Sequence, residues 1–185
     1  MRQSMLNDMI DDKLLSNRTV FLWGQVDDKS AKHVIKRLLF LELRDPGKEI
    51  KLLINSPGGY VTSGFAIYDT MHGITSPVST ICAGFAASMA SILLSAGEKG
   101  RRFVMPHGRV MIHQPSGGAR GNSADIEIQA QEIAKTKKLG AEILASNCGQ
   151  PVEKILKDFD RDHFMSADES VSYGIADGVM GEIIS

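Results

Sequence analysis

The stretch Val78–Ala96, which reads VSTICAGFAASMASILLSA, decides the fold. Its first part, Val78–Ala83, contains β-branched residues and predicts a strand, whereas Ala86–Ala96 predicts a helix. The helix is apolar nearly all the way round, so we expect it to run through the core of the protein. Ser88 then falls in the first turn of this helix, where free backbone N–H groups and the helix dipole favour developing negative charge.

The preceding sequence repeats the same alternation of strand and helix. Strands are predicted at Val20–Val26 and Ile50–Asn55, and helices at Ser30–Leu43 and Ser63–Met71. Strands and helices that alternate in this way are typical of βαβ units, which build a parallel sheet covered by helices. The sequence therefore predicts an α/β fold with a mostly parallel sheet, in a single domain that spans residues 1–185.

Composition and charge exclude several classes of protein. The 21 Lys and Arg residues are balanced by 22 Asp and Glu residues, so the sequence has no excess of positive charge for binding nucleic acid. Cys82 and Cys148 form neither a CxxC pair nor a metal-ligand spacing, so we expect no metal and a reducing compartment. Residues 1–13 lack the apolar core of a signal peptide, and residues 85–97 are too short to span a bilayer. We expect a cytoplasmic protein, with an organelle of bacterial descent as the alternative.

A long helix is predicted over residues 122–147. Asn122 and Ser123 can cap its start, acidic residues follow in the first turns and lysines come later, and Cys148-Gly149 closes it. Its apolar stripe is thin for a helix packed in a monomer core, and it includes Ile126, Ala130, Ile133 and Ile143. We therefore expect this helix to pack against a partner. The residues just before it, 117–121, predict a flexible strand at an exposed edge.

Three residues stand in settings that suit the members of a catalytic triad: Ser88, His113 and Asp162. In such a triad the histidine takes the proton of the serine hydroxyl, and the carboxylate fixes the tautomer of the imidazole. The chain order Ser, His, Asp differs from the orders of chymotrypsin, subtilisin and the α/β-hydrolases, so another scaffold is indicated. The residues alone do not choose Asp162 over Asp158 or Asp160.

Each candidate also has a structural interpretation. A serine at a helix start is usually a cap, and a lone histidine at the end of a strand is more often structural than catalytic. The segment Ser56-Pro57-Gly58-Gly59 is compatible with an ordinary β-turn. The other four histidines have simpler explanations in their local sequence: they are His33, His72, His107 and His163.

Four motifs together resemble a known family. They are, in chain order, Asn55-Ser56-Pro57-Gly58-Gly59, Ala86-Ala87-Ser88-Met89, Met111-Ile112-His113-Gln114-Pro115 and Arg161-Asp162-His163-Phe164-Met165-Ser166-Ala167. With this order and spacing, the chain from about Leu14 to Val179 resembles the Clp protease proteolytic subunit, ClpP. Several motifs spread over one chain are more specific than any single one. The resemblance implies a ClpP/crotonase-type fold with a protruding handle region at about residues 114–147.

The resemblance also implies roles for the candidate residues. Ser88 is the expected nucleophile, His113 the general base, and Asp162 the residue that orients His113. The backbone N–H groups of Gly59 and Met89 are expected to form the oxyanion hole, for which a glycine is suited because it permits unusual φ/ψ angles and close approach. No metal or organic cofactor is implied.

The resemblance also implies that the protein assembles into rings. The handle would join two seven-membered rings into a chamber, with Asp160, Arg161 and Gln114 at the interface between the rings. The alternative for the charged pair is a solvated surface cluster that contributes little. The activity implied is ATP-independent hydrolysis of peptide bonds in unfolded chains by a serine endopeptidase inside this double heptameric ring, fed by a Clp-family ATPase unfoldase.

One departure from the family pattern affects the expected partners. Lys51, Leu53 and Gly73 stand at positions where the family's docking face for the ATPase carries aromatic residues at several places, and buried aromatic groups are the usual hot spots of an interface. We therefore consider mixed rings in which a ClpP paralogue binds the ATPase. A non-catalytic or weakly active ring subunit is the main alternative function. A crotonase-type acyl-CoA enzyme, which shares the fold, is a second alternative.

Overall fold

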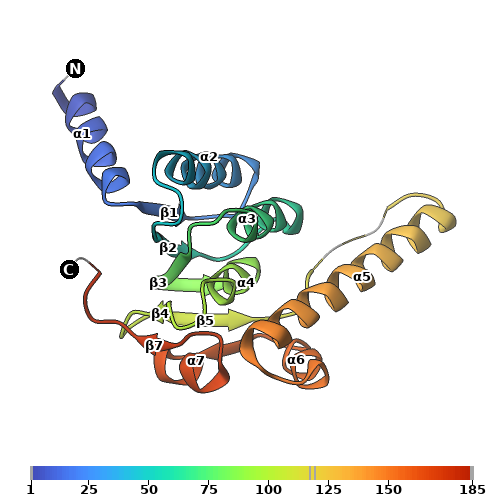
Figure 1. Ribbon diagram of the computed structural model, residues 1–185. Helices are drawn as coiled ribbons and strands as arrows, with labels where there is room; N and C mark the ends of the chain where they lie inside the picture. The colour runs from blue at the N-terminus through green and yellow to red at the C-terminus, as the bar shows by residue number, and fades with distance from the viewer. Residues whose placement is uncertain (1, 117, 119, 184–185) are drawn as a thin grey trace.

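The computed structural model describes residues 2–116, 118 and 120–183. Strands and helices alternate through most of the chain (Figure 1). The elements, in chain order, are α1 (Arg2–Ser16), β1 (Thr19–Trp23), α2 (Asp28–Arg44), β2 (Ile50–Ser56), α3 (Val61–Gly73), β3 (Val78–Ala87), α4 (Met89–Ser95), β4 (Arg102–Val104), β5 (Arg109–Ile112), α5 (Ser123–Cys148), α6 (Val152–Asp158), β6 (His163–Met165), α7 (Ala167–Tyr173) and β7 (Gly178–Val179).

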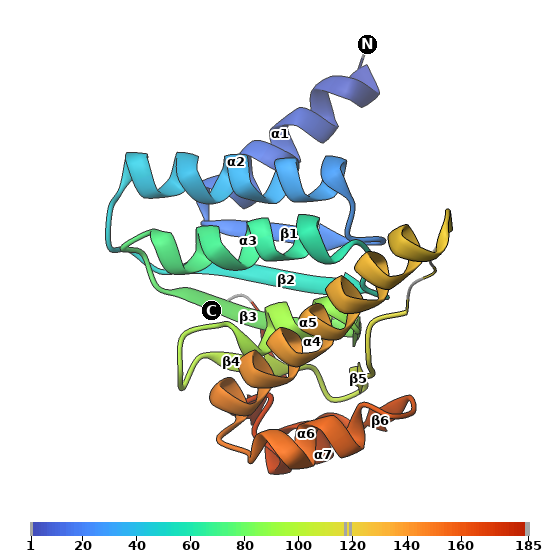
Figure 2. The same cartoon turned by 90° about the vertical axis from the view of Figure 1, so that its right-hand side faces the viewer.

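The sheet is mostly parallel, as predicted. Its main path runs β1-β2-β3-β4-β7 with every neighbouring pair parallel, while β5 joins the end of β3 and β6 runs antiparallel to β5. Helices α2, α3 and α4 lie together over one face of the sheet (Figures 1 and 2). The α/β class and the mostly parallel sheet expected from the sequence are therefore confirmed.

The core lies between this face of the sheet and the helices. Alternate residues of β1 and β2 point into it, so that Val20, Leu22, Leu52 and Ile54 are fully buried. Helix α2 contributes an apolar stripe at helical spacing, made of Ala31, Val34, Leu38 and Leu41. All residues of α4 are buried, which confirms the prediction that this helix runs through the core.

The boundary between β3 and α4 differs from the prediction. The strand continues to Ala87 and the helix begins at Met89, so Ser88 is not in the first turn of α4 but at its N-cap position. The alanines of residues 83–87 favour a helix, but pairing with β5 at Phe85↔Arg109 and Ala87↔Met111 holds the segment extended. Tertiary pairing thus overrides a local pattern that resembles a helix.

Helix α5 confirms the long helix expected near residues 122–147. Asn122 accepts a hydrogen bond from the backbone N–H of Asp125 at its start, and Gly149 closes it in the left-handed conformation. The helix protrudes from the body of the protein (Figure 1). Its buried residues lie near its C-terminal end, whereas Ile126 and Ile128 are 43% and 60% exposed. None of the helices in the described part of the chain is long and apolar enough to cross a membrane.

Two segments add to or correct the sequence-based picture. Helix α1 has no counterpart among the predicted elements, and it projects from the rest of the protein (Figure 2). Its residues Met5 and Met9 are exposed. In the predicted strand at 117–121, residues 117 and 119 lie outside the described residues, and the other three are not in a strand. There Arg120 instead exchanges two hydrogen bonds with the side chain of Gln129 on α5.

Candidate active site

Ser88 occupies a sharp turn between β3 and α4. Its backbone has φ 54° and ψ −124°, a region that costs energy for a residue with a side chain. The backbone on either side is fixed, because the N–H of Ser88 donates to Met111 O at 2.9 Å and its carbonyl accepts from the hydroxyl of Ser91 at 2.6 Å. The side chain of Ser88 makes no capping hydrogen bond to α4, so it does not act as a helix cap.

His113 and Asp162 meet at the ends of two paired strands. Strand β5 ends at Ile112 and β6 begins at His163, and these two residues are cross-strand partners. His113 follows Ile112 and Asp162 precedes His163, so these two residues are also neighbours. Nδ1 of His113 lies 3.1 Å from Oδ1 of Asp162. A proton held on Nδ1 by this carboxylate leaves Nε2 of the imidazole free to accept one.

Neither of the other two candidate aspartates is bonded to His113 in the described structure. The carboxylate of Asp158 accepts from Lys154 Nζ at 2.6 Å and from the hydroxyl of Tyr173 at 2.8 Å. Asp160 is exposed and lies on the same loop as Asp162. Of the three, Asp162 is the one whose side chain contacts His113.

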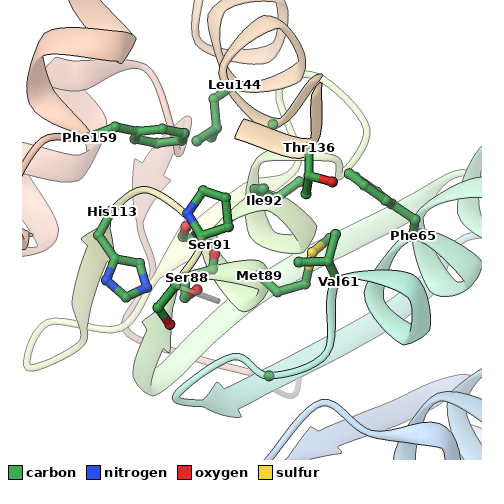
Figure 3. A pocket seen from close by; sticks show the side chains of 14 residues that line it. Val61, Phe65, Ser88, Met89, Ser91, Ile92, His113, Thr136, Leu144 and Phe159 are labelled. Atoms are coloured by element: carbon green, nitrogen blue, oxygen red, sulfur yellow. Dashed lines mark hydrogen bonds between the residues drawn. The ribbon is translucent and has the colours of Figure 1, made fainter. Parts of the chain in front are cut away.

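Ser88 and His113 line the same cavity without being bonded to each other. Both side chains face it in Figure 3. Among the described side chains, the hydroxyl of Ser88 and the imidazole of His113 share no hydrogen bond within 3.5 Å. Such bonds are often long in a ligand-free site and tighten when substrate binds.

Two consecutive glycines lie beside the site, Gly58 against the turn that carries Ser88 and Gly59 against Val26. Gly58 and Gly59 have φ values of +88° and +154°, which disfavour any residue with a Cβ atom. A Cβ on Gly58 would lie 2.6 Å from Ala87 O and 2.8 Å from Ser88 Cβ, and one on Gly59 would collide with the backbone of Val26. Both positions therefore require glycine for space as well as for conformation.

The residues expected to form the oxyanion hole border the same cavity as Ser88. Gly59 and Met89 both line it. Met89 is the first residue of α4, so its N–H has no acceptor inside the helix. Val26 holds the glycine segment through hydrogen bonds to Gly58 O and from Tyr60 N, both 2.8 Å, and the N–H of Gly59 has no partner among the backbone groups described.

The cavity, of about 80 Å³, has walls that the sequence analysis did not identify. Apolar side chains from separate elements form them (Figure 3). They are Val61, Phe65, Ile92, Pro115, Leu144 and Phe159. No spacing in the sequence signals this set, because its members come from α3, α4, α5 and two loops. A mostly apolar pocket beside a few polar groups is the usual form of a site that binds a small group.

The residues expected at an oligomer interface occupy two different environments. Asp160 and Arg161 are exposed and form no ion pair within the described part of the chain. Gln114 is half-buried, and its backbone N–H donates to Phe159 O at 2.9 Å. Its side chain accepts from Lys137 Nζ at 2.8 Å and donates to Asp160 O at 3.4 Å.

The described residues include no reactive cysteine and no candidate metal site. Cys82 and Cys148 are free thiols, and burial raises the pKa of each to about 12. No cluster of three His, Cys, Asp or Glu residues suited to a metal ion occurs among the residues the structure describes.

The family model for Clp protease matches residues 2–182, which is nearly the whole chain. The match extends beyond the region of resemblance that the motifs define. The chain belongs to the Clp protease family. It is thus a peptidase of the ClpP type, and both the family and the fold expected from the sequence are confirmed.

Proposed function

We propose that this protein is a serine endopeptidase that cleaves unfolded polypeptides inside a closed chamber. The observation that carries the proposal is the arrangement around one cavity: Ser88 on its strained turn, His113 bonded to Asp162, and Gly59 and Met89 among the lining residues. Ser88 stands in a costly backbone conformation, and its side chain makes no capping hydrogen bond to the helix. Both features are typical of a nucleophile presented on a strand-to-helix turn.

The proposed chemistry follows from these positions. Ser88 Oγ attacks the peptide carbonyl carbon while Nε2 of His113 takes the hydroxyl proton, and the N–H groups of Gly59 and Met89 stabilise the oxyanion. His113 then gives that proton to the leaving amine, which leaves an acyl-enzyme on Ser88. A water molecule, deprotonated by His113, releases the acyl group and restores the serine. Asp162 holds the imidazole orientation throughout, and bond cleavage needs neither ATP nor a metal.

The apolar cavity supports a preference at the cleavage site. Phe65, Ile92 and Leu144 line the same cavity as Ser88 and Met89 (Figure 3). We propose that it holds an apolar substrate side chain next to the scissile bond, because burial of apolar surface there contributes binding energy. Binding of that side chain would place the carbonyl between the nucleophile and the oxyanion donors.

Assembly into a double heptameric ring is the second part of the proposal. The protruding helix α5 exposes Ile126 and Ile128, and the charged groups of Asp160 and Arg161 are free for contacts with a second ring. A Clp-family ATPase unfoldase would supply the substrate in the cytoplasm, directly or through a ClpP paralogue in mixed rings. The single domain 1–185 would then form one wall of the chamber.

One observation favours a second candidate, a weakly active or non-catalytic ring subunit. Ser88 and His113 share no hydrogen bond in the described structure, and in this candidate only a contact from a partner ring would complete the triad. Both candidates use the same fold and the same family membership. They differ in whether the isolated protein reacts at Ser88.

Labelling with a fluorophosphonate, read by intact mass, distinguishes the two candidates. Ser88→Ala is the test variant, and Ser116→Ala is a matched control because Ser116 lines the same cavity and is exposed. Labelling of the isolated wild type and of Ser116→Ala, but not of Ser88→Ala, supports the endopeptidase. Labelling that appears only after addition of a paralogue ring indicates that ring contact completes the site. No labelling in either case supports the non-catalytic subunit.

A further inference from the structure

We infer that Lys137 of helix α5, acting through Gln114, is a positioning residue for the His113–Asp162 pair. The inference deepens the proposed function and rests on it, because it concerns what holds the proposed base and its orienting carboxylate. The connection runs through hydrogen bonds that join α5 to the residue after His113, and that residue to the loop carrying Asp162.

The first step is the contact between the handle helix and Gln114. Lys137 Nζ donates to Oε1 of Gln114 at 2.8 Å. Lys137 is half-buried, whereas its neighbours Lys135 and Lys138 are exposed and pair with Glu132 and Glu142 along the helix surface. Among these three lysines of α5, Lys137 is the one directed at the proposed active site.

The second step is the pair of hydrogen bonds that Gln114 donates to the loop before β6. Its backbone N–H donates to Phe159 O at 2.9 Å, and its side-chain amide donates to Asp160 O at 3.4 Å. Both acceptors lie within three residues of Asp162. Gln114 therefore holds the loop from one side, while the adjacent His113 meets Asp162 at 3.1 Å.

The loop needs this restraint because Asp162 is poorly covered. Its side chain is 58% exposed, and an exposed charge pair contributes little to its own geometry. The ammonium group of Lys137 can only donate hydrogen bonds, so it selects the amide orientation in which Oε1 faces α5 and the NH₂ group faces Asp160 O. Without Lys137 the amide can turn over, and its oxygen would then face the carbonyl oxygen of Asp160.

The consequence is a physical link between the handle and the triad. Lys137 moves with α5, and α5 protrudes beyond the body of the protein (Figure 1). A shift of α5 relative to the sheet would change the Lys137–Gln114 bond first and the loop carrying Asp162 second. A small displacement of a catalytic group can cost a large factor in rate.

The test compares two lysines of the same helix in the assembled protein. Lys137→Met removes the donor and keeps most of the side-chain volume, and Lys138→Met is the matched control at an exposed position. We expect Lys137→Met to lower kcat for a fluorogenic peptide about tenfold, as loss of a charge-assisted hydrogen bond predicts. KM should stay within about twofold, because the apolar cavity that binds substrate is untouched. Lys138→Met should match the wild type in both constants.

Two further variants separate positioning from a general loss of structure. Lys137→Arg keeps a charged donor and should restore most of kcat. Gln114→Glu keeps an acceptor for Lys137 but loses the donor to Asp160 O, so it should resemble Lys137→Met. Because both residues act in one chain of contacts, the double variant should be no slower than the slower single variant. Additive losses, or a rise in KM alone, would overturn the inference.

Hydrogen exchange gives a readout that does not depend on activity. Lys137→Met should speed amide exchange in residues 160–165 relative to Lys138→Met, while the core strand β3 keeps its protection. Equal exchange in the two variants overturns the inference whatever the activity. If the wild type neither hydrolyses peptide nor labels at Ser88, the proposed function fails. A selective change in exchange would in that case still support the link between α5 and the loop.

Discussion

The imidazole of His113 and the carboxylate of Asp162 lie 3.1 Å apart, although 49 positions separate them in the chain. Their contact is a consequence of strand register. Ile112 on β5 pairs with His163 on β6. The residue after β5 and the residue before β6, which form this contact, must therefore be adjacent. A shift of one residue in this register would separate the pair and send Phe164 to the opposite face.

Asp162→Asn should remove most of the peptidase activity without unfolding the protein. The amide can still meet Nδ1 of His113, but it does not stabilise an imidazolium or fix the required tautomer, and the equivalent change in a serine protease triad costs on the order of 10⁴ in kcat. The side chain is 58% exposed, so the free energy of unfolding should change by less than about 0.5 kcal/mol. Peptide hydrolysis and thermal unfolding of the same preparation check both parts. Full activity would exclude Asp162 as the orienting residue.

Gly59→Ala should damage both the site and the fold. The new Cβ would collide with the backbone of Val26, and the backbone at φ +154° is strained for alanine. We expect a loss of about 2–4 kcal/mol in stability and, in the folded fraction, a fall of about 10²–10³ in acylation rate as the oxyanion donor moves. Gly73→Ala, at a helical position with nothing within 4 Å of the new atom, is the control and should be close to neutral. Denaturant unfolding and fluorophosphonate labelling rates measure the two effects.

Glu42 should stabilise the fold in a pH-dependent way. Its carboxylate on α2 accepts hydrogen bonds from Ser76 and Thr75, which lower the pKa of Glu42 from 4.5 to about 2. Because the pKa is lower in the folded state, the stabilisation is complete above about pH 4.5 and is lost as the pH falls to about 2. Glu42→Gln should therefore unfold more easily than wild type at pH 7, and the difference should shrink between these limits.

The control for this pH series is Glu153→Gln, a change at an exposed glutamate of α6. It shows the effect of the same substitution at a glutamate that does not accept hydrogen bonds from Thr75 and Ser76. A difference between Glu42→Gln and wild type that is as large at pH 2 as at pH 7 would contradict the assignment.

Both cysteines should be slow towards thiol reagents in the folded protein. Burial raises the pKa of Cys82 and of Cys148 to about 12, so at pH 8 the reactive thiolate is on the order of 10⁻⁴ of each. We expect reaction with a disulfide reagent at pH 8 to be at least about 100-fold slower than in denaturant. Time courses with and without guanidinium check this. Rapid modification of the native protein would indicate that one of the thiols is more open than the structure shows.

Much of the architecture could be predicted because its signals are local. The alternation of β-branched runs with amphipathic segments gave the parallel α/β fold, and the apolar composition of residues 89–95 placed α4 in the core. The cap residues Asn122 and Gly149 allowed both ends of the long helix α5 to be predicted to within about one residue. These patterns depend on side chains a few positions apart, which the sequence displays directly.

Other features could not be predicted because they depend on contacts between distant segments. Strand β3 continues to Ala87 through its pairing with β5, and this moves Ser88 from the first turn of α4 to the N-cap position with a φ of 54°. The cavity walls come from α3, α4, α5 and two loops, so no periodic signal marks them. Helix α1 escaped prediction because its apolar residues do not gather on one buried side.

The sequence by itself determined the fold class, the family and the residue types that the chemistry needs. Only the tertiary structure decided which aspartate meets His113, because Asp158 is held by Lys154 and Tyr173 while the register of β5 and β6 delivers Asp162. It also decided that Gln114 joins α5 to the loop of Asp162. The physical reason is that periodicity and capping act within one element, whereas strand register and side-chain contacts are fixed when separate elements pack together.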